Sequence, residues 1–284
     1  LAIENPLITE EEITAWKPKR LGFQDALGKK LAGDGPKTID EGFRVAVHEL
    51  SIVEKRDDLT AIRKSIVRYI DNYVDVKNEE EKKFACKTVV KFAKTLLDGN
   101  LHVRMHAVLL IGSLNLSPEV PGMRLKAAVA YIDGLATLLD IIRAPKDGIV
   151  QPESVRILAA LEARRLLAEG RHTLKVNSKI PVDCAKRILA ELKGNGSDWY
   201  HLRLIEALAE TALSSVPNEQ NQQEPLIVEA LAEILANPRR SNQIRARAAF
   251  LLGRVPMPGG LQAAPIAYAI VKLTQKIATE VNQG

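Results

Sequence analysis

The chain has 284 residues, of which 46% are apolar and only 4% aromatic, and its formal net charge is +5. No apolar run reaches the roughly 20 residues that a membrane-spanning helix needs, and so small a net charge does not by itself indicate a polyanionic partner. The first residue is Leu1 instead of Met, so we expect a removed leader or further residues upstream and predict no compartment.

Two capping boxes predict where the first helices begin. Thr9 stands three residues before Glu12, and Thr38 stands three residues before Glu41. In this pattern the hydroxyl accepts a bond from the backbone of the first turn and the carboxylate bonds back to the cap. We expect the first box to open a short helix that ends near Trp16.

Residues 1–37 are predicted to form an N-terminal arm. Glycine, lysine and proline are frequent between Lys17 and Lys37, and these residues punctuate regular structure. We therefore expect an irregular segment with one helical piece around Phe23–Leu31.

From Thr38 onwards apolar residues recur at helical spacing, and the expected helices fall into pairs. Turn residues separate the two helices of each pair. The five expected pairs are Thr38–Val53 with Leu59–Val76, Asn78–Leu97 with Leu101–Leu114, Gly122–Ile142 with Pro152–Ala168, Pro181–Leu192 with Ser197–Leu213, and Glu224–Leu235 with Ser241–Val255.

We interpret residues 38–260 as five helical repeats and residues 261–284 as a C-terminal capping helix. Two long polar connections, Gly170–Ile180 and Ser214–Gln223, lie between pairs. Insertions there cost little, because neither connection interrupts a packed unit.

An arginine recurs near the start of the second helix of every expected pair. It follows a branched aliphatic residue, precedes a mostly alanine-rich apolar run, and returns about every 40 to 50 residues. Such a period is typical of stacked helical repeats, in which one unit cannot bury its apolar face alone. We call these five residues the arginine ladder: Arg63, Arg104, Arg156, Arg203 and Arg245.

The second helices resemble those of the HEAT repeat, which typically open with a turn aspartate and Val-Arg and end an alanine-rich run with Leu-Gly. The best matches are Val103-Arg104 with Ile111-Gly112, and Ile244-Arg245 with Leu252-Gly253. The resemblance covers about residues 38–255. The third unit departs from it, with Gln151-Pro152 in place of the turn aspartate.

The HEAT resemblance implies an all-α fold, namely a right-handed α-α superhelix (a HEAT-like solenoid) of about five helical pairs plus terminal helices. It also implies that the second helices line a concave side. The arginine ladder would then lie between neighbouring repeats and bond to turn carboxylates and carbonyls.

No catalytic, cofactor-binding or metal-binding signature is found in the sequence. His102 and His106 are four residues apart on one expected helix, as a metal pair would be, but no glutamate follows His102 to make the zinc-protease motif. His48-Glu49 resembles the motifs of HEAT-like deoxyhypusine hydroxylases, a di-iron family that needs several such pairs. We predict ordinary packing or exposure for these histidines, and we predict that Cys86 and Cys184 are small core residues instead of a disulfide or reactive thiols.

The densest aromatic cluster is Asp198-Trp199-Tyr200-His201, at the expected entry to a second helix. Tryptophan and tyrosine beside a charge are typical of binding hot spots, so Trp199 and Tyr200 are candidate partner-binding residues. The alternative is that Trp199 covers a core between repeats. Asp198 and Trp199 also resemble, over two residues only, the tryptophan and aspartate of HEAT-like DNA glycosylases.

Basic residues dominate the C-terminal part of the chain. No acidic residue lies between Glu233 and Glu280, and the fifth pair has Pro238-Arg239-Arg240 in the turn where other pairs have an aspartate. The alternative is a solvated basic cap that balances acids elsewhere. The candidate anion-binding or partner-binding residues are Arg239, Arg240, Arg247, Lys272 and Lys276.

These features favour a non-enzymatic α-solenoid scaffold that binds another protein, for which an acidic segment would suit, through its concave or loop-edge surface. The second hypothesis is a HEAT-like protein that binds nucleic acid with its basic C-terminal surface. The third is a HEAT-like enzyme of the DNA glycosylase type. No cofactor is expected, and the partner stays open because a fold of this class hosts many functions.

Overall fold

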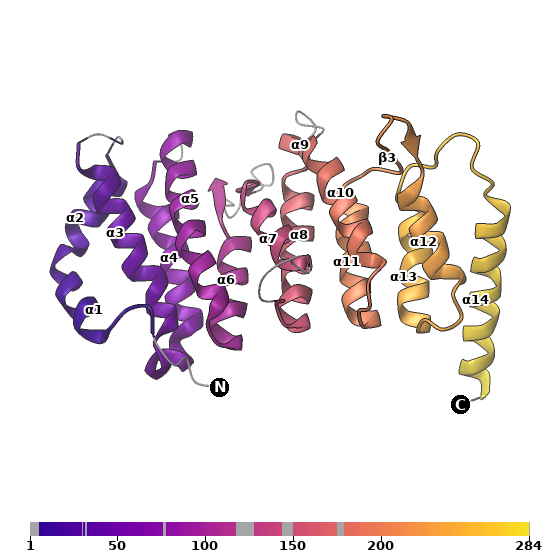
Figure 1. Ribbon diagram of the computed structural model, residues 1–284, viewed down its shortest axis with the longest axis horizontal. Helices are drawn as coiled ribbons and strands as arrows, with labels where there is room; N and C mark the ends of the chain where they lie inside the picture. Colours follow the sequence, from indigo (N-terminus) through magenta and orange to yellow (C-terminus); the bar gives the residue numbers. More distant parts are fainter. Residues whose placement is uncertain are drawn as a thin grey trace. The chain divides into compact units, whose positions relative to one another are not determined.

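The computed structural model describes residues 6–29, 31, 33–75, 78–117, 128–143, 150–174 and 179–283. Helices make up 73% of the described residues, and within them the only sheet structure is two short antiparallel strand pairs. The all-α prediction is therefore confirmed. Figure 1 gives the order of the elements along the chain.

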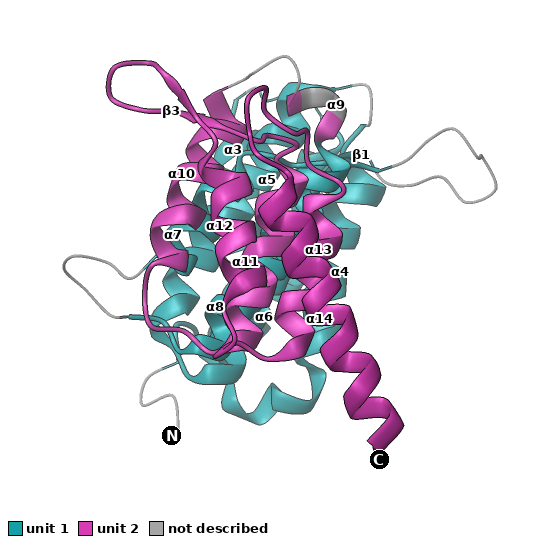
Figure 2. Cartoon of the chain, turned by 90° about the vertical axis from the view of Figure 1, so that its right-hand side faces the viewer, with its two compact units in different colours: residues 1–170 teal, residues 171–284 magenta. Residues whose placement is uncertain are grey.

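The chain forms two compact units, Leu1–Gly170 and Arg171–Gly284 (Figure 2). Each unit is built from its own helical pairs.

The N-terminal segment of the first unit is more helical than the glycine and proline content predicts. Helix α1 (Glu10–Trp16) continues through the short 3-10 helix η1 (Lys17–Lys19) into α2 (Arg20–Leu27). The capping box at its start is confirmed, because Glu12 N donates to Thr9 Oγ1 at 3.2 Å and Thr9 N donates to Glu12 Oε2 at 3.0 Å.

Packing explains why α2 is ordered as a helix. Phe23 is fully buried, and its ring lies 5.2 Å from the rings of both Phe43 and Tyr69 in edge-to-face contacts. Gly42 makes room for this ring, since a Cβ atom there would lie 2.2 Å from Phe23. The buried ring thus outweighs the weak local preference of the segment.

The second predicted capping box is wrong. Helix α3 (Gly35–His48) begins three residues before Thr38, with Pro36 in its first turn and Asp34 at the cap position. Proline suits the first turn because its missing N–H is one that the helix leaves free. Thr38 Oγ1 instead donates to Asp34 O at 3.1 Å.

Three helical pairs complete the first unit: α3 with α4, α5 with α6, and α7 with α8. First helices pack on first helices (α3 on α5, α5 on α7), and second helices pack on second helices (α4 on α6, α6 on α8). The remaining bounds are η2 (Glu49–Ser51), η3 (Val53–Asp58), α4 (Leu59–Tyr73), α5 (Glu79–Thr95), η4 (Leu96–Asp98), α6 (Leu101–Gly112), α7 (Gly134–Ile142) and α8 (Glu153–Glu169).

The expected helix Gly122–Ile142 is wrong over residues 128–133. Strand β1 (Asn115–Ser117) pairs with β2 (Val129–Ala130), and α7 begins only at Gly134. Residues 118–127 lie outside the described part of the chain. The Asp133-Gly134 dipeptide disfavours a helix that runs through it, so the helix starts there.

The second unit repeats the paired arrangement. Helix α10 packs on α11 and α12, α11 packs on α13, and both helices of the α12–α13 pair contact α14. The polar connection Ser214–Gln223 contributes to a small hairpin of β3 and β4. The bounds are α9 (Arg171–Leu174), α10 (Lys179–Leu192), α11 (Asp198–Glu210), β3 (Val216–Pro217), β4 (Gln223–Glu224), α12 (Leu226–Ala236), α13 (Asn242–Leu252) and α14 (Ala264–Gln283).

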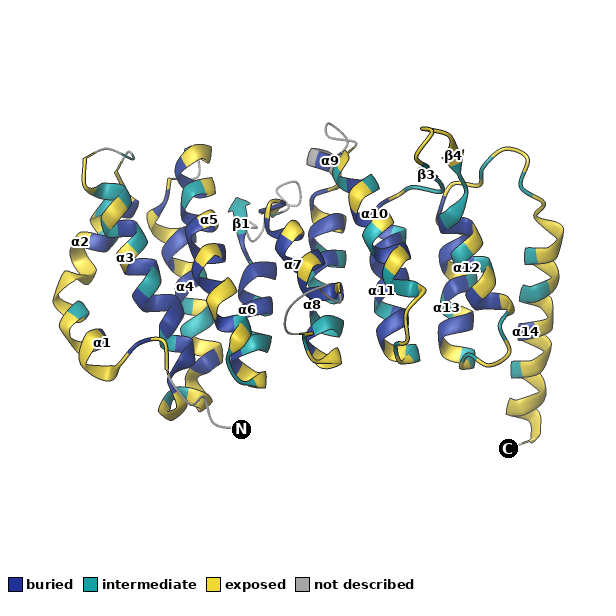
Figure 3. Cartoon of the chain, in the orientation of Figure 1, coloured by how far each residue is buried: buried dark blue, intermediate teal, exposed yellow. Residues whose placement is uncertain are grey.

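The core of each unit lies between its helices, whereas α14 is largely exposed (Figure 3). Alanines of the second helices, such as Ala107, Ala159 and Ala248, are fully buried, as close backbone approach requires. Cys86 and Cys184 are buried and unbridged, and burial raises the pKa of each thiol to about 12. Both cysteines are therefore core residues, as predicted.

None of the described helices combines the length and the hydropathy that crossing a membrane requires.

Candidate functional site

Three members of the arginine ladder make the same bond. Arg104 Nε donates to Gly99 O at 2.6 Å, Arg156 Nε to Ile142 O at 2.9 Å, and Arg245 Nε to Leu235 O at 2.9 Å. Ile142 and Leu235 lie at the C-terminal ends of α7 and α12, and Gly99 directly follows η4, the short 3-10 helix after α5. The arginine thus satisfies a carbonyl that a helix end leaves without an intrahelical partner.

These bonds lie within a pair and use main-chain carbonyls, whereas the resemblance implied contacts between repeats that include turn carboxylates. Arg104 also reaches the next pair, where its NH1 donates to Gln151 Oε1 at 3.2 Å. Gln151 Nε2 donates in turn to Leu97 O at 3.1 Å. Gln151, which stands where an aspartate was expected, therefore links the second and third pairs.

Arg63 and Arg203 differ from the other three ladder residues. Arg203 NH1 bonds to Glu206 Oε2 of its own helix at 2.8 Å. Burial lowers the pKa of Arg63, and the charge of Glu162 on α8 opposes that shift. Arg63 and Arg203 have the same place in the sequence period as the other three ladder residues. Their surroundings differ from those of the other three, because each faces a nearby carboxylate.

Two stripes of side chains on α11 and α13 form a candidate binding surface in the second unit. The residues of each stripe are spaced by four, three and four positions, so each stripe lies on one helix face. The two helices pack against each other. The stripes are Trp199, Arg203, Glu206 and Glu210 on α11, and Gln243, Arg247, Phe250 and Arg254 on α13 and the turn after it. We call this set the α11–α13 surface.

Exposed aromatic rings alternate with arginines on the α11–α13 surface. Trp199 is 46% exposed and Phe250 is 53% exposed. The Arg203 guanidinium lies 4.1 Å from the centre of the Trp199 ring, and that of Arg247 lies 5.0 Å from the centre of Phe250. These are cation–π distances, so each ring carries an arginine on its face.

Buried carboxylates hold these arginines from below. Glu206 Oε2 lies 2.8 Å from Arg203 NH1, and Glu206 Oε1 lies 2.8 Å from Arg247 Nε. Glu210, also buried, forms ion pairs with Arg171 and Arg254. The carboxylates lie beneath the surface, so the outer layer presents guanidinium groups and aromatic rings.

A shallow hollow of ≈ 420 Å³ lies between the two stripes. Leu202 and Ala246 give it an apolar wall and Phe250 stands beside it. Its polar lining consists of Arg203, Arg247, Gln243 and the carboxylate side chain of Glu206, which is paired with both arginines. An apolar side chain with a neighbouring anion fits such a hollow better than a fully charged or a fully apolar group does.

Other sequence candidates have different surroundings. Tyr200 is buried, so it is a core residue and not a partner-binding one. Asp198 accepts from Arg240 NH1 at 2.9 Å and from Ser241 N at 2.6 Å. Burial opposes ionisation of Asp198, but these bonds outweigh it and lower the pKa of that carboxyl. Asp198 therefore ties the turn before α13 to the start of α11.

The predicted basic end of the chain is not one uncompensated patch. Arg240 and Arg247 are paired with Asp198 and Glu206 of α11, acids that lie outside the basic stretch of sequence. Within α14, Lys276 lies 3.6 Å from Glu280 and Lys272 lies 4.9 Å from the centre of the Tyr268 ring. Arg239 is exposed, and among the described residues no carboxylate pairs with it.

His48 and His102 have polar protein partners, and His106 is partly buried. His102 Nε2 lies 2.6 Å from Arg56 NH2, and His48 Nε2 lies 3.0 Å from Thr95 Oγ1. Burial, followed by the charges of Arg63 and His102, lowers the pKa of His106. Across the described ranges, no three His, Cys, Asp or Glu side chains come together as metal ligands would.

Sequence reasoning missed Glu206, Glu210 and Phe250. Their signal was present, since Trp199, Arg203, Glu206 and Glu210 follow the spacing of one helix face. Because Arg203 also fits the arginine ladder, the repeat pattern does not reveal that it shares a helix face with Trp199, Glu206 and Glu210.

Comparisons of the chain with protein-family models, with curated proteins and with solved structures find no match.

Proposed function

We propose that the chain is a non-enzymatic HEAT-like α-solenoid scaffold that binds another protein, and that the α11–α13 surface receives an acidic, partly apolar segment of that partner. The observation that carries the proposal is the exposure of Trp199 and Phe250, each with an arginine held against its ring by a buried glutamate.

The residue types and their rigidity support a protein partner. Tryptophan and arginine are enriched among the residues that contribute most to protein–protein binding. Arg203 and Arg247 are already fixed by Glu206. Fixed side chains lose less conformational entropy when a partner binds, so more of the contact energy is retained.

The charge of the surface supports an acidic segment. Three arginines of the surface, Arg203, Arg247 and Arg254, share the two buried carboxylates of Glu206 and Glu210 with Arg171 of the neighbouring helix α9. Positive charge is therefore left over at the outer layer, and complementary charge favours an acidic partner and the correct orientation.

Nucleic acid stays the second candidate. Bases could stack on Trp199 and Phe250, as they do on aromatic side chains of single-strand-binding proteins. Phosphate binding, however, uses uncompensated cations, and the buried glutamates already neutralise part of the arginine charge. This difference is why we place a protein partner first.

The stacking of the helices supports the HEAT-like solenoid. Within each unit, first helices stack on first helices and second helices on second helices, as expected for repeats that contact their neighbours. Small-angle X-ray scattering of the purified chain tests it. A particle markedly longer than it is wide supports the solenoid, and a globular profile contradicts it.

Site-specific photo-crosslinking tests the partner class. A p-benzoylphenylalanine at Gln243, beside the hollow, should capture a partner in cells, whereas the same group at the exposed Lys186 on α10 should not. We expect an adduct whose shift on gel electrophoresis is unchanged by nuclease treatment. A nuclease-sensitive adduct would favour the second candidate.

Loss-of-contact variants test the surface itself. The double substitution Trp199→Ala and Phe250→Ser should weaken capture of the crosslinked partner without lowering the melting temperature greatly, because both rings are about half exposed. Tyr268→Ala is the matched control, since Tyr268 is 60% exposed and also carries a cation on its ring, but lies on α14. Equal binding by both variants contradicts the proposed site.

A further inference from the structure

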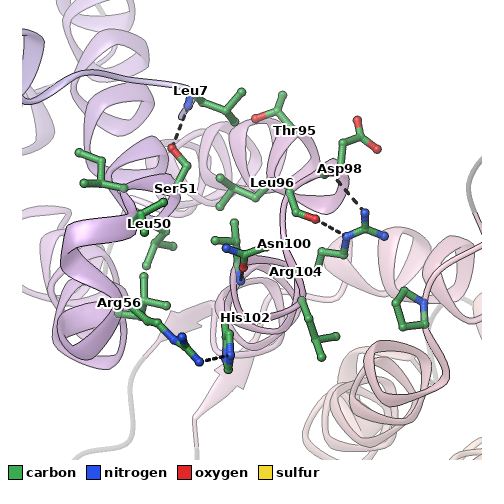
Figure 4. A pocket seen from close by; sticks show the side chains of 17 residues that line it. Leu7, Leu50, Ser51, Arg56, Thr95, Leu96, Asp98, Asn100, His102 and Arg104 are labelled. Atoms are coloured by element: carbon green, nitrogen blue, oxygen red, sulfur yellow. Dashed lines mark hydrogen bonds between the residues drawn. The ribbon is translucent and has the colours of Figure 1, made fainter. Parts of the chain in front are cut away.

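A larger hollow lies in the first unit, at the edge formed by the turns within its first two helical pairs. Figure 4 shows side chains from the segment around Leu7, from η2 and η3, and from the η4–α6 turn around it. Its volume is ≈ 1050 Å³, which is in the size range of pockets for small organic ligands.

The lining of this hollow is mainly aliphatic. Buried side chains form its base and partly exposed ones form its mouth, so a ligand could bury apolar surface against both. The buried residues are Leu50, Leu96 and Val103, and the exposed ones are Leu7, Val53 and Leu101.

Two arginines face the hollow without a carboxylate partner in the described part of the chain. Arg104 donates to Gly99 O, to Asp98 O and to Gln151 Oε1, all of which are uncharged acceptors. The exposed Arg56 lies 2.6 Å from Nε2 of His102, although Asp57 and Asp58 follow it directly in sequence. Two positive charges therefore remain uncompensated at the wall of an apolar hollow.

The neutral polar groups of the wall already have partners. Ser51 Oγ accepts from Leu7 N at 2.9 Å, and Asn100 Oδ1 accepts from Val103 N at 3.0 Å as the cap of α6. Thr95 Oγ1 lies 3.0 Å from His48 Nε2. The carboxylate of Asp98, the one acidic side chain of the lining, turns away from the Arg104 guanidinium (Figure 4).

We propose that this hollow binds a small amphipathic monoanion, with an aliphatic or aromatic body on the leucine-rich base and its anionic head at Arg56. A charge-assisted bond to a guanidinium is stronger than a neutral one. The positive end of the α6 dipole, which begins at Leu101, adds to the attraction.

The segment around Leu7 lines one side of the hollow and favours a compact ligand over an extended peptide. The segment around Leu7 is fixed there by the bond from Leu7 N to Ser51 Oγ and by the burial of Ile8. An extended chain that followed this edge would meet that segment. The inference is independent of the α11–α13 surface, which lies in the other unit.

The probes are dodecanoate and 8-anilinonaphthalene-1-sulfonate, two anions with apolar bodies. Titration calorimetry with dodecanoate and fluorescence with the sulfonate should each show one saturable site in the wild-type chain, and each probe should displace the other. Dodecanol, which has the same aliphatic chain but no charge, should bind at least about tenfold more weakly than dodecanoate. Equal affinity for dodecanol overturns the monoanion assignment.

Matched variants locate the site. Arg56→Gln should weaken dodecanoate binding at least about tenfold, whereas Arg68→Gln, which removes an exposed arginine of α4 outside the hollow, should not. Leu101→Asp should also abolish binding while leaving the fold intact, because an acid in the first turn of a helix is favourable. The proposal is overturned if the wild type shows no saturable binding, or if Arg56→Gln and Leu101→Asp bind as the wild type does.

Discussion

The ammonium nitrogen of Lys82 and the carboxylate oxygen Oδ1 of Asp71 lie 3.9 Å apart inside the first unit, and neither atom has a hydrogen-bond partner. Lys82 is fully buried. Burial lowers the pKa of Lys82 and raises that of Asp71, and each charge only partly offsets the effect on the other. Lys82 is thus a buried member of an ion pair whose carboxylate is partly exposed, and the pair lacks the bonds that would make it favourable.

We expect the double substitution Lys82→Met and Asp71→Asn to leave the free energy of unfolding unchanged or to raise it by about 1–4 kcal/mol. Asp71→Asn alone should lower it by about 3 kcal/mol, because Lys82 would keep a buried charge with only the weaker influence of Asp75 to oppose it. Urea denaturation followed by circular dichroism measures both. A double variant that is clearly less stable than the wild type would contradict this account.

His48 should make the protein less stable in mild acid. Burial, followed by the charge of Arg44, lowers the pKa of its imidazole to about 4, against the opposing charge of Glu12. In the unfolded chain the pKa is about 6.5, so the unfolded state binds more protons between these values. The contribution of neutral His48 to the free energy of unfolding is therefore complete above about pH 6.5. It is lost as the pH falls toward 4, by up to about 3 kcal/mol.

The variant His48→Gln isolates this effect, because glutamine can still bond to Thr95. Urea midpoints measured at pH 7 and pH 4.5 should fall less in the variant than in the wild type. His106 remains in both proteins, and its pKa is lowered as well. The effect of His48 is therefore the difference between the two proteins in how far the urea midpoint falls from pH 7 to pH 4.5. An equal fall in both proteins would assign the acid sensitivity to other groups.

The sequence predicts the helices well where the signals for their ends lie in the neighbouring residues. The capping box at Thr9 and the aspartate-glycine turn after α5 contain their own signals, and the helices begin and end close to those residues. The start of α3 depends on Pro36 in its first turn. The helical form of α2 depends on Phe23, which packs in a core with Phe43 and Tyr69. Contacts between distant segments are not encoded in a local pattern.

The candidate site was predictable only in part, because charge along a sequence is not charge on a surface. Arg247 lies in a stretch that has no acidic residue, yet Glu206 of another helix lies 2.8 Å from it. Trp199 was identified from its residue type, whereas Tyr200, the next residue, points into the core. Neighbours on a helix point in different directions, so aromatic clusters in sequence separate in space.

The ladder bond should matter more to stability than surface charge does. Arg245 is buried and its Nε bonds to Leu235 O, whereas Arg239, six residues earlier, is exposed and has no ion pair among the described residues. Arg245→Ala should lower the free energy of unfolding by about 2 kcal/mol, as the loss of a charged hydrogen bond implies. Arg239→Ala should change it by less than about 0.5 kcal/mol. Thermal melts of the two variants, compared with the wild type, decide between a structural and a superficial role.

The two glycines that match each other in the repeat motif should respond oppositely to alanine. A Cβ atom at Gly112 would lie 2.1 Å from Glu162 Oε2, whereas one at Gly253 would meet only Phe250 O at 3.4 Å. Gly112→Ala must therefore displace a mostly buried carboxylate side chain, and we expect it to destabilise the protein by about 1–3 kcal/mol. Gly253 ends α13 with a negative φ of −74° that alanine adopts without strain, so Gly253→Ala should stabilise the protein by up to about 1 kcal/mol by restricting the unfolded chain. Urea midpoints measure both changes, and a Gly112→Ala variant as stable as Gly253→Ala would show that Glu162 can move aside without loss.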